Sequence, residues 1–371
     1  MSKNQFFPSR RKSLKHVVTC LFLSISATSL ISASAAAASY DVVDLTTLSQ
    51  GTPVVVRGPN IAGVAVGGGR LVGASGEQRG LIFENKTVRQ IVGLAASDSA
   101  SVFGINDSGG FVGGSNTATN LRAFVSAASG GVRELPPLAG DTASTAYALN
   151  NLSEAVGFSS GASGEHAVIW KASGTPTALP GALAMPSSRA TGINERGDVA
   201  GVMGTAAGTR AILWPGGQAS RELPLLAGHA TSEAQAVNGR GDVVGYSATS
   251  TRLRRAVLWS SGGATVDLGT LPGGDFSQAF GINDAGDVVG SSESSVGDRA
   301  TLWTSGGLQD LNSLIAPSNF VLSKAVGINN TGMIVAIGHD LVAAVANAPT
   351  HDESHEMPVR VFLLTRSGAS K

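Results

Sequence analysis

The sequence is poor in charge and nearly lacks cysteine, and each shortage excludes a class of protein. Charged residues make up 14% of the 371 positions, well below the roughly 25% that is usual for globular domains. Basic and acidic residues are equal in number, 26 of each, so the chain lacks the basic excess with which proteins bind nucleic acid. The single cysteine, Cys20, can form no disulfide within the chain, which excludes a disulfide-stabilised fold.

The first 38 residues have the pattern of an export signal. Basic residues precede a moderately apolar run, and an alanine-rich tract follows with an A-x-A site at Ala36 and Ala38. The stretch SRRKSLK at 9–15 is similar to the twin-arginine export motif, with Ser13 where that motif prefers phenylalanine. An ordinary secretory signal with two adjacent arginines is the alternative. We predict a signal peptide over 1–38 and a secreted or periplasmic bacterial protein.

Removal of this segment would leave a mildly acidic chain without a membrane anchor. Five basic and no acidic residues precede Ser39, so 21 of the 26 basic residues remain against 26 acidic ones. No later apolar run approaches the ~20 residues that a membrane-spanning helix needs. We therefore expect no nucleic-acid partner and no membrane span after the signal is removed.

Glycine is abundant, with 49 copies, and many of them belong to a repeated motif, A-x-G-I-N-x-x-G-x-V-V-G. Its asparagines lie 44 to 46 residues apart, and in the first copy Val66 holds the equivalent place. A fixed period in this range indicates a repeat architecture. The asparagines are Asn106, Asn150, Asn194, Asn238, Asn283 and Asn329.

Each repeat contains four strand-like segments separated by turn residues. In the sixth repeat they are SQAFGIN, DVVGSS, RATLWT and LQDLNSL. Alternation and β-branched residues favour strands, and no window has a convincing helical period. Four strands in ~44 residues are typical of a β-propeller blade. The sequence predicts an all-β protein, a seven-bladed propeller that forms a single domain over 39–371.

The two ends of the predicted propeller complement each other. The seventh repeat ends with a third strand at 359–365 and has no fourth one. Near the N-terminus, YDVVDLTTL at 40–48 resembles fourth strands such as TVDLGTL at 265–271. We predict that 40–48 completes the seventh blade and closes the ring, which would hide exposed strand edges.

The Asn-x-x-Gly segment of the motif is explained by the turn that it makes. Glycine adopts the left-handed conformation that a tight hairpin connection needs. The asparagine side chain can bond nearby backbone groups and hold the turn. We expect these turns to be structural.

Two further segments, R-A-x-L-W and a D-L-G-x-L-P-G-like strand, complete a pattern that resembles the HAF-repeat family of extracellular bacterial proteins. The sixth repeat matches most fully, with AFGINDAGDVVG, RATLW and DLGTLPGG. The resemblance covers roughly 60–338 and 360–365. It implies an exported repeat protein with a propeller-like fold, and it brings no established reaction and no catalytic residues.

Four features are candidates for a site, and for each we favour the alternative without a ligand: a chance motif match, packing between blades, polar contacts at strand starts and solvated turn residues, respectively. A G-x-S-x-G match places Ser159 as a nucleophile but lacks the strand-turn-helix context of that motif. Tryptophans that end third strands could form a sugar platform or pack between blades: Trp170, Trp214, Trp259 and Trp303. Arginines that begin third strands could surround an anion or make polar contacts: Arg122, Arg210, Arg255, Arg299 and Arg360. Aspartates after the turn glycine could bind calcium or be solvated: Asp198, Asp242 and Asp287.

One stretch, at about 339–359, breaks the repeat as an insertion in the seventh unit. It contains His351, Asp352 and His355, and His339 lies near its start. The two histidines four residues apart could share a divalent metal if the loop were helical. A hydrophilic solvated loop is the alternative. The sequence requires no other cofactor.

The function that these features favour is a binding or structural module for a protein, glycan or small molecule. The alternative is a secreted hydrolase or lyase with its site at the mouth of the propeller channel, because propellers host both classes. Acids and histidines in the channel would favour an enzyme, and alanine, glycine and valine a module. Loops between second and third strands vary most among the repeats, so we expect partner contact on their face.

Overall fold

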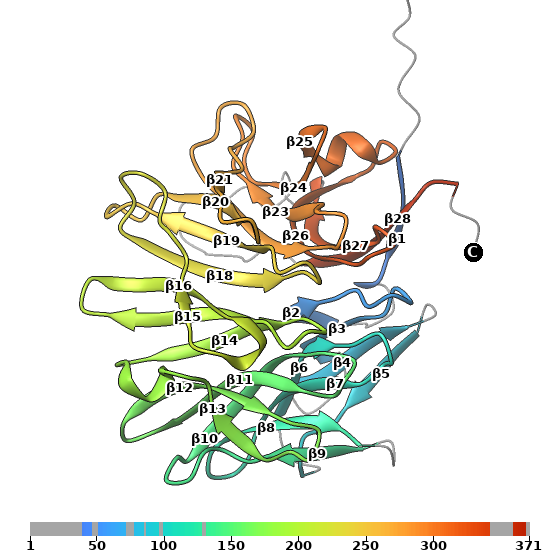
Figure 1. The fold of residues 1–371 in the computed structure, drawn as a ribbon. Coiled ribbons are helices and arrows are strands. Elements are labelled where there is room, and N and C mark those ends of the chain that lie inside the picture. The colour runs from blue at the N-terminus through green and yellow to red at the C-terminus, as the bar shows by residue number, and fades with distance from the viewer. Residues whose placement is uncertain are drawn as a thin grey trace, which may run out of the picture. The chain divides into compact units, whose positions relative to one another are not determined.

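The structure, a computed structural model, describes residues 39–46, 51–71, 78–84, 87–95, 99–127, 131–341 and 359–368. All of them belong to one unit, Ala38–Lys371. Their strands form seven four-stranded sheets in which every neighbouring pair is antiparallel, and the sheets follow one another as the blades of a propeller (Figure 1). The predicted seven-bladed β-propeller is confirmed.

The first three blades each use four consecutive strands. Blade one contains β2 (Gly51–Arg57), β3 (Ala65–Leu71), β4 (Gln78–Glu84) and β5 (Thr87–Ile91). Blade two contains β6 (Ser99–Ile105), β7 (Phe111–Asn116), β8 (Leu121–Ser126) and β9 (Val132–Leu135). Blade three contains β10 (Ala143–Leu149), β11 (Ala155–Gly161), β12 (Gly164–Trp170) and β13 (Pro176–Ala178).

The next three blades follow the same order, with very short outer strands. Blade four contains β14 (Ser188–Ile193), β15 (Val199–Thr205), β16 (Gly208–Trp214) and β17 (Arg221–Glu222). Blade five contains β18 (Thr231–Val237), β19 (Val243–Ala248), β20 (Arg254–Trp259) and β21 (Thr265–Asp267). Blade six contains β22 (Ser277–Ile282), β23 (Val288–Ser292), β24 (Arg299–Thr304) and β25 (Gly307–Asp310).

Three short 3-10 helices accompany blades three, four and six in the described part of the chain. Helix η1 (Ala182–Ala184) follows blade three, η2 (Pro215–Gly217) lies between the third and fourth strands of blade four, and η3 (Leu311–Leu314) follows blade six. The last of them corrects the expected fourth strand of the sixth repeat. That strand ends at Asp310, whose carboxylate accepts a hydrogen bond from the backbone N–H of Asn312 at 2.9 Å and so caps η3.

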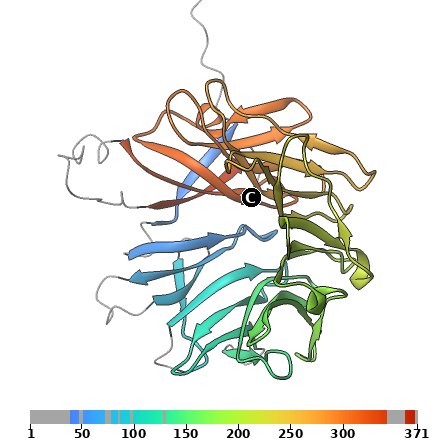
Figure 2. The same ribbon diagram turned by 90° about the vertical axis from the view of Figure 1, so that its left-hand side faces the viewer.

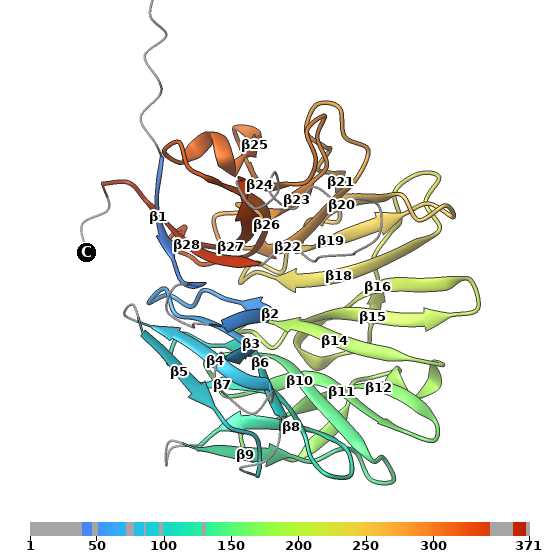
Figure 3. The ribbon, with the colours of Figure 1, turned by 180° about the vertical axis from the view of Figure 1, so that it is seen from behind.

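Blade seven combines the two ends of the described chain. It contains β26 (Phe320–Ile328), β27 (Ile334–Asp340), β28 (Arg360–Arg366) and β1 (Tyr40–Asp44). Strand β1 lies antiparallel to β28, with Tyr40 opposite Arg366 (Figure 3). The first blade lies between this blade and the second (Figure 2). The predicted closure by the N-terminal strand is confirmed for 40–44; residues 47 and 48 lie outside the described part.

The turn asparagines form a closed ring of hydrogen bonds. Each Nδ2 donates to the backbone carbonyl of the corresponding asparagine in the next blade. The seven links are 60 to 106 (3.1 Å), 106 to 150 (3.0 Å), 150 to 194 (3.2 Å), 194 to 238 (2.8 Å), 238 to 283 (3.1 Å), 283 to 329 (3.4 Å) and 329 to 60 (2.7 Å). Each Oδ1 accepts backbone N–H groups of its own turn, as predicted; Asn238, for example, accepts those of Arg240 and Asp242.

The ring corrects the alignment of the first repeat. The equivalent residue there is Asn60 and not Val66, which lies within β3 opposite Arg57. Residues 60–63 read N-I-A-G and form the same turn, with Gly63 at φ +80°. The adjacent glycine-rich segment of β3 conceals this match, because its glycines align with the motif in more than one register.

Candidate functional site

One residue of the first strand bulges out of the sheet in most blades. In blades two to six the pairing of the two inner strands skips a residue, and in blade seven it skips two. A β-bulge leaves the extra residue unpaired and re-aims its side chain. The skipped residues that lie three positions before the turn asparagine are Phe103, Tyr147, Thr191, Gln235, Phe280 and Val326.

The last glycine of the repeat motif permits the bulge. At Gly157 in β11 an added Cβ would lie 1.9 Å from the backbone oxygen of Thr145 on the bulged strand. At Gly245 in β19 the corresponding distance to Glu233 is 2.0 Å. No larger residue fits between two backbones at that separation. The glycine of V-V-G is therefore needed because the neighbouring inner strand bulges against it.

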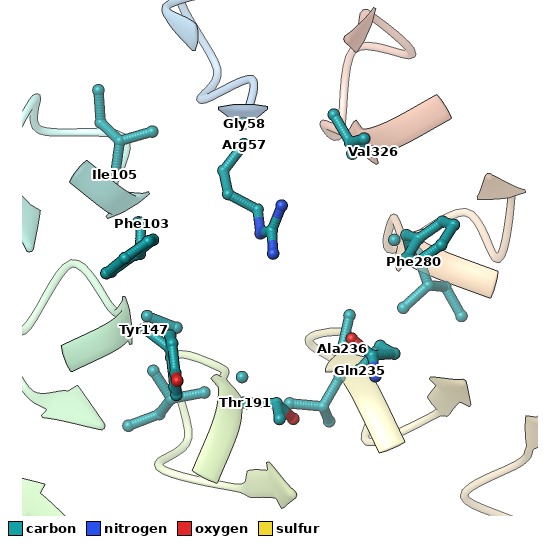
Figure 4. A pocket seen from close by; sticks show the side chains of 18 of the residues that line it. Arg57, Gly58, Phe103, Ile105, Tyr147, Thr191, Gln235, Ala236, Phe280 and Val326 are labelled. Carbon is teal, nitrogen blue, oxygen red and sulfur yellow. The ribbon is translucent and has the colours of Figure 1, made fainter. Parts of the chain in front are cut away.

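The bulged side chains surround an axial cavity of about 600 Å³. Figure 4 shows Phe103, Tyr147, Gln235 and Phe280 around the cavity, and it shows Arg57 of β2 extending toward its centre. The other lining residues are mostly the glycines, alanines and isoleucines that recur at equivalent places of the repeat motif. The cavity thus has a uniform frame and a lining that differs from blade to blade.

Two cations of the cavity have no acidic partner in the described ranges. Arg57 donates to the backbone oxygen of Val56 at 2.9 Å, and Lys324 lies 5.0 Å from the ring centre of Phe280. Burial lowers the pKa of the Arg57 guanidinium. Burial, together with the nearby charge of Arg57, also lowers the pKa of Lys324. Arg57 is exposed to solvent within the open cavity and Lys324 is half-buried, and the surrounding walls displace part of the water around each charge.

The cavity is lined by two further charged groups. Arg189 forms an ion pair with Glu165 at 2.5 Å. Burial and the neighbouring Glu233 carboxylate raise the pKa of Tyr246, so that hydroxyl stays protonated. Glu233 contributes one negative charge, which Arg57 and Lys324 together outweigh, so the cavity carries a net positive charge.

The repeated tryptophans pack between blades, as predicted. All four are at most 4% exposed, which excludes a sugar platform. Three indoles donate to a proline carbonyl of the preceding blade: Trp170 to Pro136 (2.7 Å), Trp214 to Pro180 (2.9 Å) and Trp259 to Pro224 (2.7 Å). The Nε1 of Trp303 has no partner in the described part; Gly269, at φ +76°, stands where the others have proline.

The repeated arginines join third strands to fourth strands, as predicted, and do not surround a ligand. Arg255 donates to Thr270 at 3.2 Å. The other four face an acid on the fourth strand: Arg122–Glu134 (3.3 Å), Arg210–Glu222 (3.1 Å), Arg299–Asp310 (3.7 Å) and Arg360–Asp44. The last pair shows that β1 carries the same acid as an ordinary fourth strand.

Two of the three turn aspartates are buried and Asp287 is half-buried, which corrects the expectation that they are solvated. Asp198 and Asp242 are each 8% exposed. Burial would raise the pKa of Asp198, but hydrogen bonds from Asn194, Arg196 and the backbone outweigh it and lower that pKa. In the described part of the chain, no three acidic, histidine or cysteine side chains gather into a metal-binding group. These aspartates fasten turns and do not form a calcium site.

Ser159 is a structural residue. It is fully buried, accepts the backbone N–H of Leu138 at 2.9 Å and donates to Asp141 at 2.6 Å. Ser115, Ser247 and Ser292 accept corresponding bonds in other blades. The G-x-S-x-G match is therefore a product of the repeat, as expected.

The metal candidates of the seventh repeat, His351, Asp352 and His355, lie outside the described residues, so metal binding there stays a prediction. His339 and Asp340 belong to β27, opposite Val321 and Phe320. They are therefore part of blade seven, although the sequence placed them in the insertion.

Comparisons with known proteins support the fold alone. No protein-family model matches the chain, and no curated protein matches it. The β-propeller domain of the Trilobed protease from Pyrococcus furiosus has a TM-score of 0.53 at 11% identity, over 86% of this chain and 95% of its own. Virginiamycin B lyase from Staphylococcus aureus has a TM-score of 0.50 at 11% identity, over 88% and 98%. A puromycin-hydrolyzing peptidase from Mycobacterium tuberculosis has a TM-score of 0.56 at 13% identity, over 79% of this chain and half of its own.

The Pyrococcus propeller is described as having an open velcro topology. In this chain the seventh blade instead takes its outer strand from the N-terminal side. Among the described residues, no helix has the length and apolar character to cross a membrane.

The sequence analysis did not identify the cavity residues, because they differ from repeat to repeat and the candidate sites were taken from residues that recur. The signal was the single variable position within an otherwise repeated segment, the x of A-x-G-I-N. It reads F, Y, T, Q, F and V from the second repeat to the seventh. Arg57 could not be found in this way while the first repeat was misaligned.

Proposed function

We propose that this propeller is a binding module that holds a small anionic molecule in its axial cavity. The observation that carries the proposal is the pair of cations that line the axial cavity, Arg57 and Lys324, which have no acidic partner in the described part of the chain and whose pKa values are lowered by burial. A ligand anion would supply the missing countercharge. Hydrogen bonds to charged groups contribute roughly 1.5–3 kcal/mol each, more than neutral ones.

The lining of the cavity supports binding over catalysis. It contains one carboxylate, Glu233, and no histidine or cysteine. That carboxylate lies beside the Tyr246 hydroxyl. The alternative, a hydrolase or lyase with a site at the mouth of the channel, is supported less, because histidine, the commonest general acid–base group, does not line this cavity.

We also propose that the protein is an exported member of the HAF-repeat group. The support is the N-terminal signal pattern and the repeat motif. Mass spectrometry of the protein recovered from the medium and the periplasm would test export: a mature N-terminus near Ser39 is expected. Recovery of the intact chain in the cytoplasm alone would contradict it.

The binding proposal is tested by calorimetric titration with acetate, hexanoate, phosphate and sulfate. Arg57→Gln and Lys324→Gln should each weaken binding of the preferred anion at least ~10-fold, by loss of a charge-assisted hydrogen bond. Arg196→Gln, which removes an exposed cation in a turn, is the matched control and should leave affinity unchanged. Equal binding by all four proteins, or none of these anions bound by the parent protein, would overturn the proposal.

A further inference from the structure

A second cavity, of about 280 Å³, adjoins the axial one beside blades two and three. Phe103 and Tyr147 line both cavities, and Phe158 lines only the second. The ring centres of Phe103 and Tyr147 lie 5.6 Å apart, and those of Tyr147 and Phe158 lie 5.9 Å apart, in tilted arrangements. These separations are typical of interacting aromatic rings. The three rings make one apolar wall, which we call the aromatic row.

One polar group of this side cavity has no partner. Thr145 lines the cavity, is 2% exposed, and its hydroxyl has no hydrogen-bond partner in the described part of the chain. Gln78 and Ser101, which also line the cavity, are bonded to each other at 2.5 Å. Leaving a buried hydroxyl unpaired costs free energy. This hydroxyl lies within the wall of the cavity, so a ligand group that reached it would remove that cost.

The two cavities are close enough for one small molecule. Val55 lines the side cavity and Arg57 lines the axial one, and both belong to β2. Residues two apart on a strand have Cα atoms about 7 Å apart and point to the same face, and Phe103 and Tyr147 line both cavities. A ring at the aromatic row therefore lies beside the cavity that contains Arg57, and an acid whose ring and carboxylate are joined by a short linker fits this arrangement.

We propose that the ligand is an aromatic acid, with its anionic group held by Arg57 in the axial cavity and its ring in the side cavity against the aromatic row. The Thr145 hydroxyl bonds a polar substituent of that ring. This inference rests on the proposed anion-binding function. A sugar acid is disfavoured, because a sugar carries a hydroxyl on most carbons and would leave them unpaired against an aromatic wall.

The position of the side cavity agrees with the expected binding face. Asn116 ends β7 and Leu121 begins β8, and both line the cavity. The cavity thus lies at the end of blade two that carries the connection between its second and third strands. That is the face on which the repeats differ most.

The test uses four probes: 3-(4-hydroxyphenyl)propanoate, 3-phenylpropanoate, hexanoate and 4-ethylphenol. Calorimetric titration of the full chain should give at least fivefold tighter binding of the aryl acids than of hexanoate. Thr145→Val should weaken 3-(4-hydroxyphenyl)propanoate at least fivefold and leave 3-phenylpropanoate and hexanoate unchanged. Phe158→Leu should weaken both aryl acids and leave hexanoate unchanged.

Thr301→Val is the matched control. The Thr301 hydroxyl is also buried without a partner, and it lines neither cavity. Both valine variants should unfold at or above the parent temperature, because each removes an unpaired buried hydroxyl. Only Thr145→Val should change binding, so a general effect on folding is separated from a contact to the ligand.

The outcomes separate this inference from the function on which it rests. If Arg57→Gln weakens hexanoate and the aryl acids alike, while the rings add no affinity, the anion site stands and the aromatic inference fails. If Arg57→Gln changes nothing, the anion site fails. In that case 4-ethylphenol still reports on the side cavity: binding that is lost in Thr145→Val keeps the ring site, and absence of binding removes it.

Discussion

Two positions in each blade, three residues apart near the end of the first strand, differ in how much the residue varies among the blades. At one, all seven blades have asparagine, and the seven side chains close a ring of hydrogen bonds. At the other, the blades carry arginine, phenylalanine, tyrosine, threonine, glutamine, phenylalanine and valine, and these side chains face the axial cavity (Figure 4). The first position is repeated because every blade must bond to the next. The second can vary because a bulged or terminal residue makes no bond that joins one blade to the next.

The comparison teaches where function resides in a repeat protein. Tryptophans, arginines, aspartates and serines that recur from blade to blade are all engaged in contacts between strands or blades. The residues without such contacts are those that break the repeat at the cavity. Four experiments test this contrast between repeated and variable positions.

The largest effect is expected from replacing Tyr40–Asp44 with a glycine–serine segment of equal length. This removes the outer strand of blade seven, the buried Tyr40 ring and the Arg360–Asp44 ion pair. The free energy of unfolding should fall by more than ~5 kcal/mol, and aggregation through the exposed edge of β28 should follow. Asp41→Asn, an exposed change on the same strand, is the control. Unfolding and light scattering at the parent's values would contradict closure by β1.

The next effect compares the two positions directly, through Gln235→Ala on β18 and Asn238→Ala in the turn that follows it. Asn238 is 3% exposed, and its loss leaves two backbone N–H groups of its turn without partners and removes the bond to the carbonyl of Asn283 in the next blade. We expect a loss of ~2–4 kcal/mol for Asn238→Ala, since unsatisfied buried groups are costly. Gln235→Ala should change stability by less than ~0.5 kcal/mol. Urea unfolding of both variants measures this, and similar values for the two would refute the contrast.

The third experiment concerns Lys324, whose pKa burial lowers from its usual value of 10.5. Because the folded state disfavours the charged form, this lysine reduces stability below its folded pKa, and stability is regained as the pH rises from that value toward 10.5. Lys324→Met should therefore raise the melting temperature at pH 7, more than at high pH, while it weakens anion binding. Anion affinity of the parent should fall as the pH rises through the lowered pKa. A melting temperature that drops in the methionine variant would count against an uncompensated cation.

The smallest effect compares two tryptophans. Trp259 donates to Pro224 at 2.7 Å, whereas Trp303 has no partner in the described residues. Phenylalanine in either place removes similar buried area, so Trp259→Phe should cost about 1 kcal/mol more than Trp303→Phe, the net value of one hydrogen bond. Thermal unfolding of the pair decides this, and an equal cost would show that the bond adds nothing to packing.

The fold followed from local features that survive in a linear sequence. The ~44-residue period, the four strand-like segments and the Asn-x-x-Gly turns predicted the propeller, and the likeness of 40–48 to a fourth strand predicted its closure. The first repeat was misaligned at Val66, because Asn60 precedes a run of glycines that fits the motif ambiguously. The fourth strand of the sixth repeat is shorter than the sequence predicts, because Asp310 caps the helix η3 instead of continuing the strand.

By itself, the sequence determined which residues are structural, because each blade repeats the same contacts and repetition is visible without coordinates. Only the tertiary structure decided that Arg57, Lys324, Thr145 and the aromatic row lie together. They come from four different blades, and no spacing along the chain encodes the bulge that turns the inner strands toward the axis. Whether a cation has an acidic partner, or a hydroxyl a hydrogen bond, depends on groups in other strands and other blades, which meet only when the chain folds.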